Sequence, residues 1–309
     1  MAAALIAVII ALVLGHAAPQ LAALRRFGWF GRWLAWLAEH AGAAFASRFG
    51  VLLSIGVPVA LLAALQAALA GHALGLPAFL LALLVVFWCW GPRDLDLDVE
   101  AVLDAPDRER RQLAARALFD TDALDTDALD ADADAEAAPA LQGSALVVAV
   151  FRGALQRWFA VLLWFLLLGP AGALLYRLTQ LASEPVLSST LPPAHAAMAA
   201  RLRRILEWPV AQLCVFALAL VANFDVVIGS WRDWHAQHGR GWLQLDSGFL
   251  DAVALASVDC ELIEEEAYDP AESAPPTLLA LRDAMSLVWR ILLLWLTVLA
   301  LAVLAGFVN

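Results

Sequence analysis

Lysine is absent from this chain, because all nineteen basic residues are arginine. That bias is typical of a GC-rich bacterial genome. Cysteine is scarce, with three residues. Cys89 and Cys214 lie in apolar runs and Cys260 lies in a polar segment, with no paired spacing. A disulfide framework or a zinc knuckle is therefore not expected.

Common enzyme motifs are also missing. The chain has no GxxxxGK[ST] or GxGxxG phosphate-binding pattern, no HExxH zinc motif and no GxSxG nucleophile motif. Its long apolar runs contain no Asp, Glu or Lys. Ion-coupled carriers place such residues in the middle of the membrane, so this pattern disfavours ion-coupled transport.

Apolar sequence dominates what is present. Hydrophobic residues make up 63% of the chain and charged residues 16%, against roughly 45–50% and 25% in soluble domains. Several runs without a charged side chain are long enough, or nearly so, to cross a hydrocarbon core about 30 Å thick. These runs are residues 51–69, 73–91, 158–176, 208–224 and 291–308. The sequence predicts an all-α, polytopic helical membrane protein with five or six membrane segments and additional amphipathic cytoplasmic helices.

The first fifty residues predict a membrane segment followed by an interfacial helix. Residues 1–24 lack the basic start of a cleaved signal peptide, so we expect a retained membrane helix. The next stretch, 25–49, mixes Arg25, Arg26 and Arg32 with several tryptophans, a composition that suits the lipid headgroup layer. Its function is either a lipid or partner contact, or simple anchoring at the interface.

One loop carries the net charge of the whole chain. Residues 94–136 hold fifteen acidic and four basic residues, a balance of −11 that equals the formal charge of the protein. Such a loop repels phosphate, so nucleic-acid binding is disfavoured. Its first part, 94–119, predicts two short amphipathic helices with a break near Pro106. The repeat DTDALDTDALDADAD at 120–134 indicates a solvated linker, and it lacks the turn glycine and the glutamate of a calcium loop.

Arginine positions predict the topology. Gly71-His72 is too short a link for anything but an antiparallel hairpin, and arginines flank both of its ends, so both flanks are expected in the cytoplasm. Residues 145–178 leave two interpretations open. One is a single span bent at Pro170. The other is a re-entrant or broken hairpin that turns back at 169–172 and keeps the arginines that follow on the cytoplasmic side.

The last polar region, 230–285, is interpreted as a cytoplasmic loop that contains a helix from about Gly248 to Glu266. His235 and His238 would share a face on a helix and could bind a metal. No third ligand is suitably spaced, so a solvated loop is the interpretation adopted. The complete division is 1–24, 25–49, 50–92, 93–144, 145–229, 230–285 and 286–309.

Several segments together resemble the AmpE family of bacterial inner-membrane proteins, which is related to the CobD/CbiB cobinamide synthases. They are VEAVLDAPDRERRQLAARALF at 99–119, FRGALQRWFAVLLWFLLLGPAGALLYRLTQL at 151–181, RLRRILEWPVAQL at 201–213 and SLVWRILLLWLTVLALAVL near the C-terminus. The resemblance covers most of the chain from about Gly50 onward. It implies a multi-pass inner-membrane protein with a sensory or regulatory role in β-lactam stress, tied to inducible β-lactamase and to a cell-wall amidase pathway.

The resemblance to the synthases fails at their polar positions. This chain has Arg152, Gly153 and Gln156 where they carry acidic and amide residues. Later amide and acidic positions correspond to Thr179 and Ala182. Catalysis that needs ionisable groups there is therefore not expected, although a CobD-like synthase that retains corrinoid or nucleotide binding is the alternative. No cofactor or metal is assigned.

If the synthase cleft persists as a binding site, these replacements make it positive. Arginine side chains would then line its cytoplasmic mouth and bind an anionic ligand. The same arginines can be explained without a site, as the positive residues that flank membrane segments on the inside. The candidates are Arg152, Arg157, Arg177, Arg201, Arg203 and Arg204.

Overall fold

The computed structural model describes residues 2–17, 25, 27–70, 75–90, 94–119, 143–238, 245–268 and 276–306. All regular structure within these ranges is helical, which confirms the all-α prediction. Four helical stretches among the described residues are long and apolar enough to cross a membrane. They are Leu52–Leu69, Gly143–Leu168, Pro193–Val221 and Thr277–Leu304.

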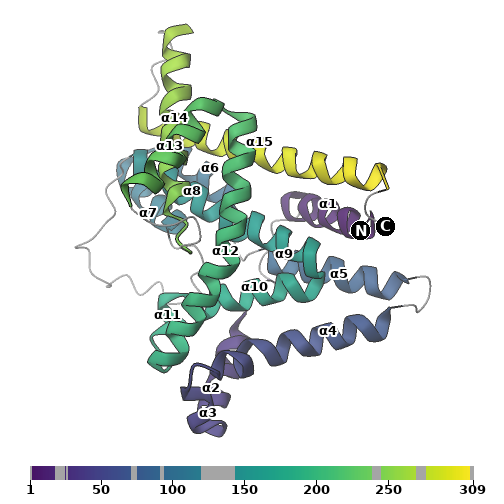
Figure 1. The fold of residues 1–309 in the computed structure, drawn as a ribbon. Coiled ribbons are helices and arrows are strands. Elements are labelled where there is room, and N and C mark those ends of the chain that lie inside the picture. Colours follow the sequence, from purple (N-terminus) through teal and green to yellow (C-terminus); the bar gives the residue numbers. More distant parts are fainter. Residues whose placement is uncertain are drawn as a thin grey trace.

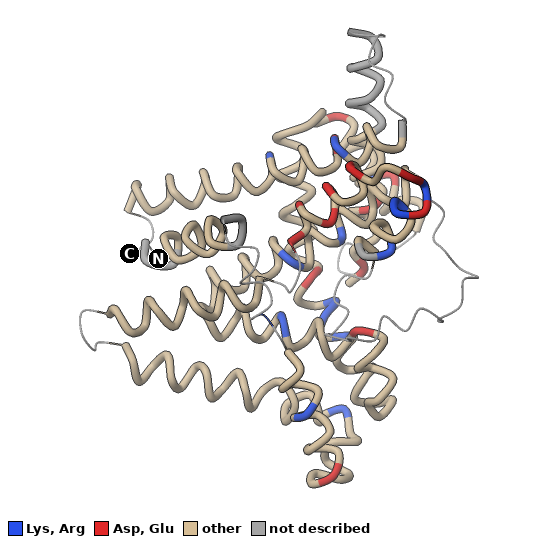
Figure 2. Tube along the Cα trace, turned by 180° about the vertical axis from the view of Figure 1, so that it is seen from behind, with Lys and Arg blue, Asp and Glu red and all other residues tan. Residues whose placement is uncertain are grey.

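One half of the molecule has the uncharged, apolar surface of a lipid-facing region. Helices α1 (Ala2–Ala17), α4 (Val57–Leu69), α5 (Leu76–Cys89) and α15 (Pro276–Leu304) project to the same side (Figure 1). Figure 2 shows no charged residue over their projecting ends, while acidic and basic residues gather at the other side of the molecule. Leucines such as Leu61, Leu84 and Leu301 are more than half exposed there. So much exposed apolar surface favours a bilayer over water.

Helices α4 and α5 pack side by side, as the hairpin prediction requires. Gly75 precedes α5 with a φ of 81°, a left-handed conformation that glycine adopts without strain. Pro77 then lies in the first turn, where its missing N–H costs no helical hydrogen bond. The Gly71-His72 link itself lies outside the described residues.

The segment 143–183 is a broken hairpin, the second of the two interpretations. Helix α8 (Gly143–Ala154), the π-helical turn η5 (Leu155–Phe159) and α9 (Ala160–Leu168) form one continuous helical stretch. The chain then reverses at Gly169, and α10 (Pro170–Ser183) packs back against α9. The approach is so close that a Cβ on Gly172 would lie 2.1 Å from the Trp164 carbonyl oxygen.

The acidic loop begins with the two helices that the sequence predicts. Helices α6 (Leu95–Leu103) and α7 (Arg108–Phe119) are the two short helices, separated at Pro106. The buried face of α6 includes Leu95, Val99 and Val102. The Asp-rich repeat at 120–134 lies outside the described residues.

Two predictions on other segments need correction. The stretch 25–49 is not one helix but two, α2 (Gly28–His40) and α3 (Gly42–Ala46), because Gly42 starts the second with a φ of 45°. The tryptophan- and histidine-bearing stretch is not a loop, because Asn223 caps helix α13 (Phe224–Gln237) by accepting two backbone N–H groups. The predicted apolar run 208–224 lies largely in α12 (Pro193–Val221), one of the four stretches long enough to cross a membrane, and α12 runs across the direction of α4 and α15 in Figure 1.

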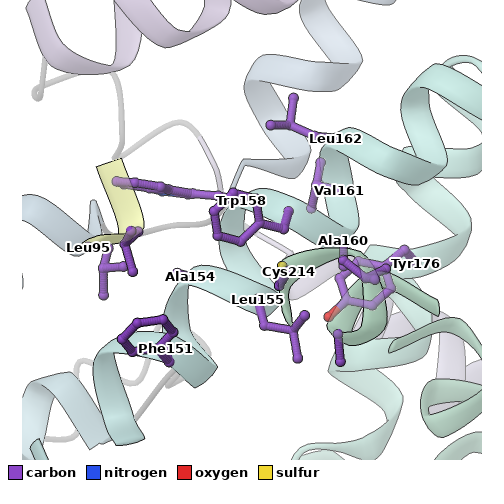
Figure 3. Packing of buried hydrophobic residues seen from close by; sticks show 14 of the residues in the cluster. Leu95, Phe151, Ala154, Leu155, Trp158, Ala160, Val161, Leu162, Tyr176 and Cys214 are labelled. Atoms are coloured by element: carbon purple, nitrogen blue, oxygen red, sulfur yellow. The ribbon is translucent and has the colours of Figure 1, made fainter. Parts of the chain in front are cut away.

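Helix α14 (Gly248–Tyr268) confirms the helix expected in the last polar region and packs against α13. The short α11 (Pro185–Ser188) joins α10 to α12. The hydrophobic core lies where the helices from the middle of the chain pack together. Figure 3 shows side chains from α6, α8, η5, α10 and α12 converging there, among them Leu95, Phe151, Trp158, Tyr176 and Cys214.

Candidate functional site

A cleft of about 740 Å³ opens among the charged residues on the side away from the projecting helices. Helices α7, α8, α12 and α14 and the α10–α11 junction contribute to its walls. Its polar lining consists of Ser144, Arg152, Gln156, Glu184 and Arg203. Pockets of roughly 300–1,000 Å³ are typical of small-molecule sites, so this cleft is the candidate functional site.

Arg152 is fixed at the cleft by an ion pair that joins α8 to α14. Its Nε donates to both carboxylate oxygens of Asp251, at 3.0 and 3.2 Å, and its Nη2 also donates to Asp251. This fork geometry holds the guanidinium plane in one orientation. Within the described residues, Nη1 has no hydrogen-bond partner, so one edge of Arg152 is held and the other is available to a ligand.

Arg203 lies in a second charged network. Its Nε donates to Glu207 at 2.8 Å, and its Nη1 lies 3.6 Å from a carboxylate oxygen of Glu184. The hydroxyl of Tyr176 donates to the same Glu207 oxygen at 3.0 Å. Glu207 and Tyr176 are buried, so the network fixes Arg203 from behind while Arg203 and Glu184 line the cleft.

Gln156 occupies the π-helical turn η5. Only 8% of its surface is exposed, and that surface lines the cleft. Its side-chain amide has no hydrogen-bond partner within the described part of the chain. Wider π-helical turns often mark functional sites in otherwise regular helices. Here the turn holds two successive polar side chains with different surroundings, because Gln156 lines the cleft whereas Arg157 lies in the core.

The two most deeply buried candidate arginines do not belong to the cleft. Arg157 is fully buried and donates from Nη1 to Asp98 at 2.7 Å. Arg177 is also fully buried, donates to the Gln180 side chain at 2.7 Å and lies over the Phe27 ring. Both side chains lie in the core, where a soluble ligand cannot reach them.

Arg25 is a further buried arginine, just before α2. It lies over the Phe87 ring with 4.3 Å to the ring centroid. Burial lowers the pKa of Arg25, and the neighbouring carboxylate of Asp94 opposes that shift.

Arg201 and Arg204 are exposed on α12, outside the cleft lining. Arg204 donates only to the backbone carbonyl of Ala200 in its own helix. The structure thus brings two of the six candidates, Arg152 and Arg203, to one cleft and places the other four elsewhere. The expectation of a single mouth lined by all six is wrong.

The cleft is not purely positive, because acidic residues that the sequence analysis did not single out lie beside its arginines. They are Glu184, Glu207 and Asp251. Glu207 follows Arg203 by four residues on the same helix, a spacing that predicts an ion pair. Asp251 is 99 residues from Arg152, and no local pattern could have identified it.

His235 and His238 lie at the end of α13 rather than in a loop. Their Nδ1 atoms approach the carbonyl oxygens of Trp231 and Trp234 at 2.8 Å, and the His238 ring stacks on Trp234. These contacts give the two rings a packing role. Across the described ranges, no three His, Cys, Asp or Glu side chains are grouped closely enough to hold a metal ion.

Comparison of the chain with protein-family models, with curated proteins and with solved structures finds no match in any of the three.

Proposed function

We propose that this protein is an AmpE-like regulatory protein of the bacterial inner membrane, which responds to cell-wall stress by binding a ligand in its cytoplasmic cleft. The observation that carries the proposal is the cleft itself, with Gln156 buried at its wall and Arg152 oriented by Asp251. The resemblance of residues 99–119, 151–181 and 201–213 to that family supports the link to β-lactamase induction and to an amidase pathway.

The lining favours binding over catalysis. Among the residues that the structure describes, the lining has one hydroxyl, that of Ser144, and no His or Cys that could activate a nucleophile. Its arginines are held in one geometry by carboxylates, and a guanidinium group stays protonated and does not act as a general base. Pre-oriented guanidinium groups are well suited to recognition.

The orientation follows from charge. The charged side of the molecule, which contains the cleft, carries the arginines that the positive-inside rule assigns to the cytoplasm. A ligand in the cleft would therefore come from the cytoplasm, where an intracellular signal of wall damage would be present. The bilayer is the permanent partner of the opposite half.

A reporter of β-lactamase induction in the encoding bacterium tests the proposal. Arg152→Gln should lower the response to a β-lactam while membrane insertion stays normal, because the variant removes a cleft cation outside the lipid-facing half. Arg201→Gln is the matched control, since it removes an exposed arginine outside the cleft. A wild-type response from Arg152→Gln, or an equal loss from both variants, would refute the proposal.

One observation favours a CobD-like synthase as the second candidate. Glu184, Glu207 and Asp251 place ionisable groups around the cleft although the synthase positions at 152, 153 and 156 are not acidic. Expression in a strain that lacks cobinamide synthase decides between the two. Restored corrinoid synthesis would favour the enzyme, and continued dependence on added cobinamide is the outcome we expect.

A further inference from the structure

Gln156 presents its side-chain amide at the wall of the cleft. The side chain is 92% removed from solvent, since 8% of its surface is exposed, yet its amide has no partner among the residues that the structure describes. The exposed surface of Gln156 lines the cleft, where water can bond to the amide. A group bound in the cleft can take the place of that water and form hydrogen bonds with Gln156.

The chemistry of that amide narrows the choice of ligand. A primary amide offers N–H donors and a carbonyl acceptor side by side. Another amide group complements this pattern, because it can accept from the NH₂ group and donate to the carbonyl oxygen. A ligand that contains a peptide bond could both accept a hydrogen bond from the Gln156 NH₂ group and donate one to its carbonyl oxygen.

The charged residues around Gln156 are mixed in sign. Arg152 keeps its Nη1 edge available to a ligand, and Glu184 lines the same cleft beside Arg203. With Asp251 and Glu207 behind them, the cleft has three carboxylates and two guanidinium groups, a balance of −1. A multiply charged anion is disfavoured by this balance. A zwitterion fits it, with a carboxylate at Arg152 and an ammonium group at Glu184.

The rest of the lining is apolar. Leu118, Phe119, Val148, Val186 and Leu255 come from α7, α8, α11 and α14. Val186 is 57% exposed, so covering it would remove apolar surface from water. The ligand therefore has apolar side chains as well as charged ends.

We propose that the cleft binds a short peptide with apolar side chains and free ends, with Gln156 recognising its amide. This inference rests on the proposed function, because it names the class of ligand for the same cleft. A zwitterionic lipid headgroup has the same pair of charges but no peptide amide, so the structure favours the peptide.

Isothermal titration calorimetry on the full chain in phosphatidylglycerol nanodiscs tests the proposal, with the dipeptide Leu-Phe as the probe. N-acetyl-Leu-Phe lacks the ammonium group, and Leu-Phe amide lacks the carboxylate. We expect each blocked peptide to bind about tenfold or more weakly, the effect of losing one hydrogen bond to a charged group. Undetectable binding of Leu-Phe at millimolar concentration, or equal binding of all three peptides, would overturn the proposal.

Variants then assign the contacts. Gln156→Leu keeps the approximate volume and should weaken Leu-Phe binding about tenfold, and Arg152→Gln should abolish the preference for the free carboxylate. Arg201→Gln should bind as the wild type does. Melting curves identify folded variants. If Gln156→Leu fails to fold, the loss of carboxylate preference in Arg152→Gln is the deciding result, and an unchanged preference refutes the proposal.

Two comparisons separate this inference from others. Loss of Leu-Phe binding when phosphatidylethanolamine is added to the nanodiscs would identify a lipid headgroup as the occupant and overturn the peptide assignment. Peptide binding without any effect of Arg152→Gln on β-lactamase induction would leave the peptide site standing and refute the regulatory role. If Leu-Phe does not bind but Arg152→Gln lowers the induction of β-lactamase, the peptide proposal is refuted and the regulatory role stands.

Discussion

Arg157 in the π-helical turn η5 forms a buried ion pair with Asp98 of α6, 59 residues earlier in the chain. The two side chains are 0% and 6% exposed. This contact joins the start of the acidic loop to the continuous helical stretch 143–168. Removing one partner of such a pair leaves an uncompensated buried charge.

Asp98→Ala should therefore destabilise the protein by about 3–5 kcal/mol, measured as a lower melting temperature in mild detergent. The double variant Asp98→Leu with Arg157→Met should recover most of that loss, because it buries no charge. Asp107→Ala is the comparison, since its pair with Arg110 is exposed and its carboxylate also caps α7 by accepting the backbone N–H of Arg110, contacts whose loss costs about 0.5–2 kcal/mol. Equal melting temperatures of Asp98→Ala and Asp107→Ala would contradict this account.

The reversal of the broken hairpin should depend on glycine. Gly169 has φ 69° and ψ −157°, a conformation open essentially to glycine alone. A Cβ there would also lie 2.8 Å from the side-chain nitrogen of Gln66 in α4. We expect Gly169→Ala to cost about 1–3 kcal/mol, seen as a lower melting temperature.

Gly229→Ala provides the comparison for that variant. Gly229 lies within α13, and a Cβ would meet nothing within 4 Å. Alanine is favoured over glycine in helices by about 1 kcal/mol, so this variant should be neutral or more stable. A Gly169→Ala protein as stable as Gly229→Ala would show that the turn is not strained.

Topology can be tested with single cysteines in a background without Cys89, Cys214 and Cys260. A cysteine at Asp104, which is exposed at the end of α6, and one at Asp130 should resist an impermeant thiol reagent in intact cells, because both positions are predicted to be cytoplasmic. A cysteine at His72 should react, since the link between α4 and α5 is predicted to face the other side. Labelling at Asp104 and Asp130 but not at His72 would reverse the assignment.

The Asp-rich repeat should be dispensable for folding. A tract of Asp, Ala and Thr buries too little apolar surface to repay the entropy of ordering it. Deletion of residues 120–136 should leave the yield and the melting temperature nearly unchanged. A fall of many degrees would mean that the tract packs against the rest of the protein.

Hydropathy and local periodicity are sufficient to predict most of the helices but not their arrangement. The apolar spacing in 94–119 predicted α6 and α7, and the Gly-Pro pair at 169–170 indicated the reversal. The same signals misassigned α13, because Trp234 and His235 meet Phe249 of α14 and a tertiary contact of that kind leaves no local pattern. Composition also could not show that α12 runs across the other long helices.

The candidate site was only partly predictable for a related reason. Arginines are visible in a sequence, but whether each one faces a cleft or the core depends on distant partners. Arg157 forms an ion pair with Asp98 in the core, whereas Arg152 forms one with Asp251 at the cleft. In the sequence Gln156 is only a departure from the synthase pattern, and its place in the cleft wall depends on the packing of helices that are distant in the chain.

The uncharged half of the molecule also bears on how the protein enters its membrane. Moving one elementary charge across a potential of 100 mV changes the free energy by about 2.3 kcal/mol. The membrane potential therefore favours or opposes the translocation of a charged loop, depending on the sign of its charge. The hairpin of α4 and α5 and its link, residues 51–91, contain no Asp, Glu, Lys or Arg. Its insertion therefore moves no fixed charge through the field, and cells with a collapsed membrane potential should still insert it.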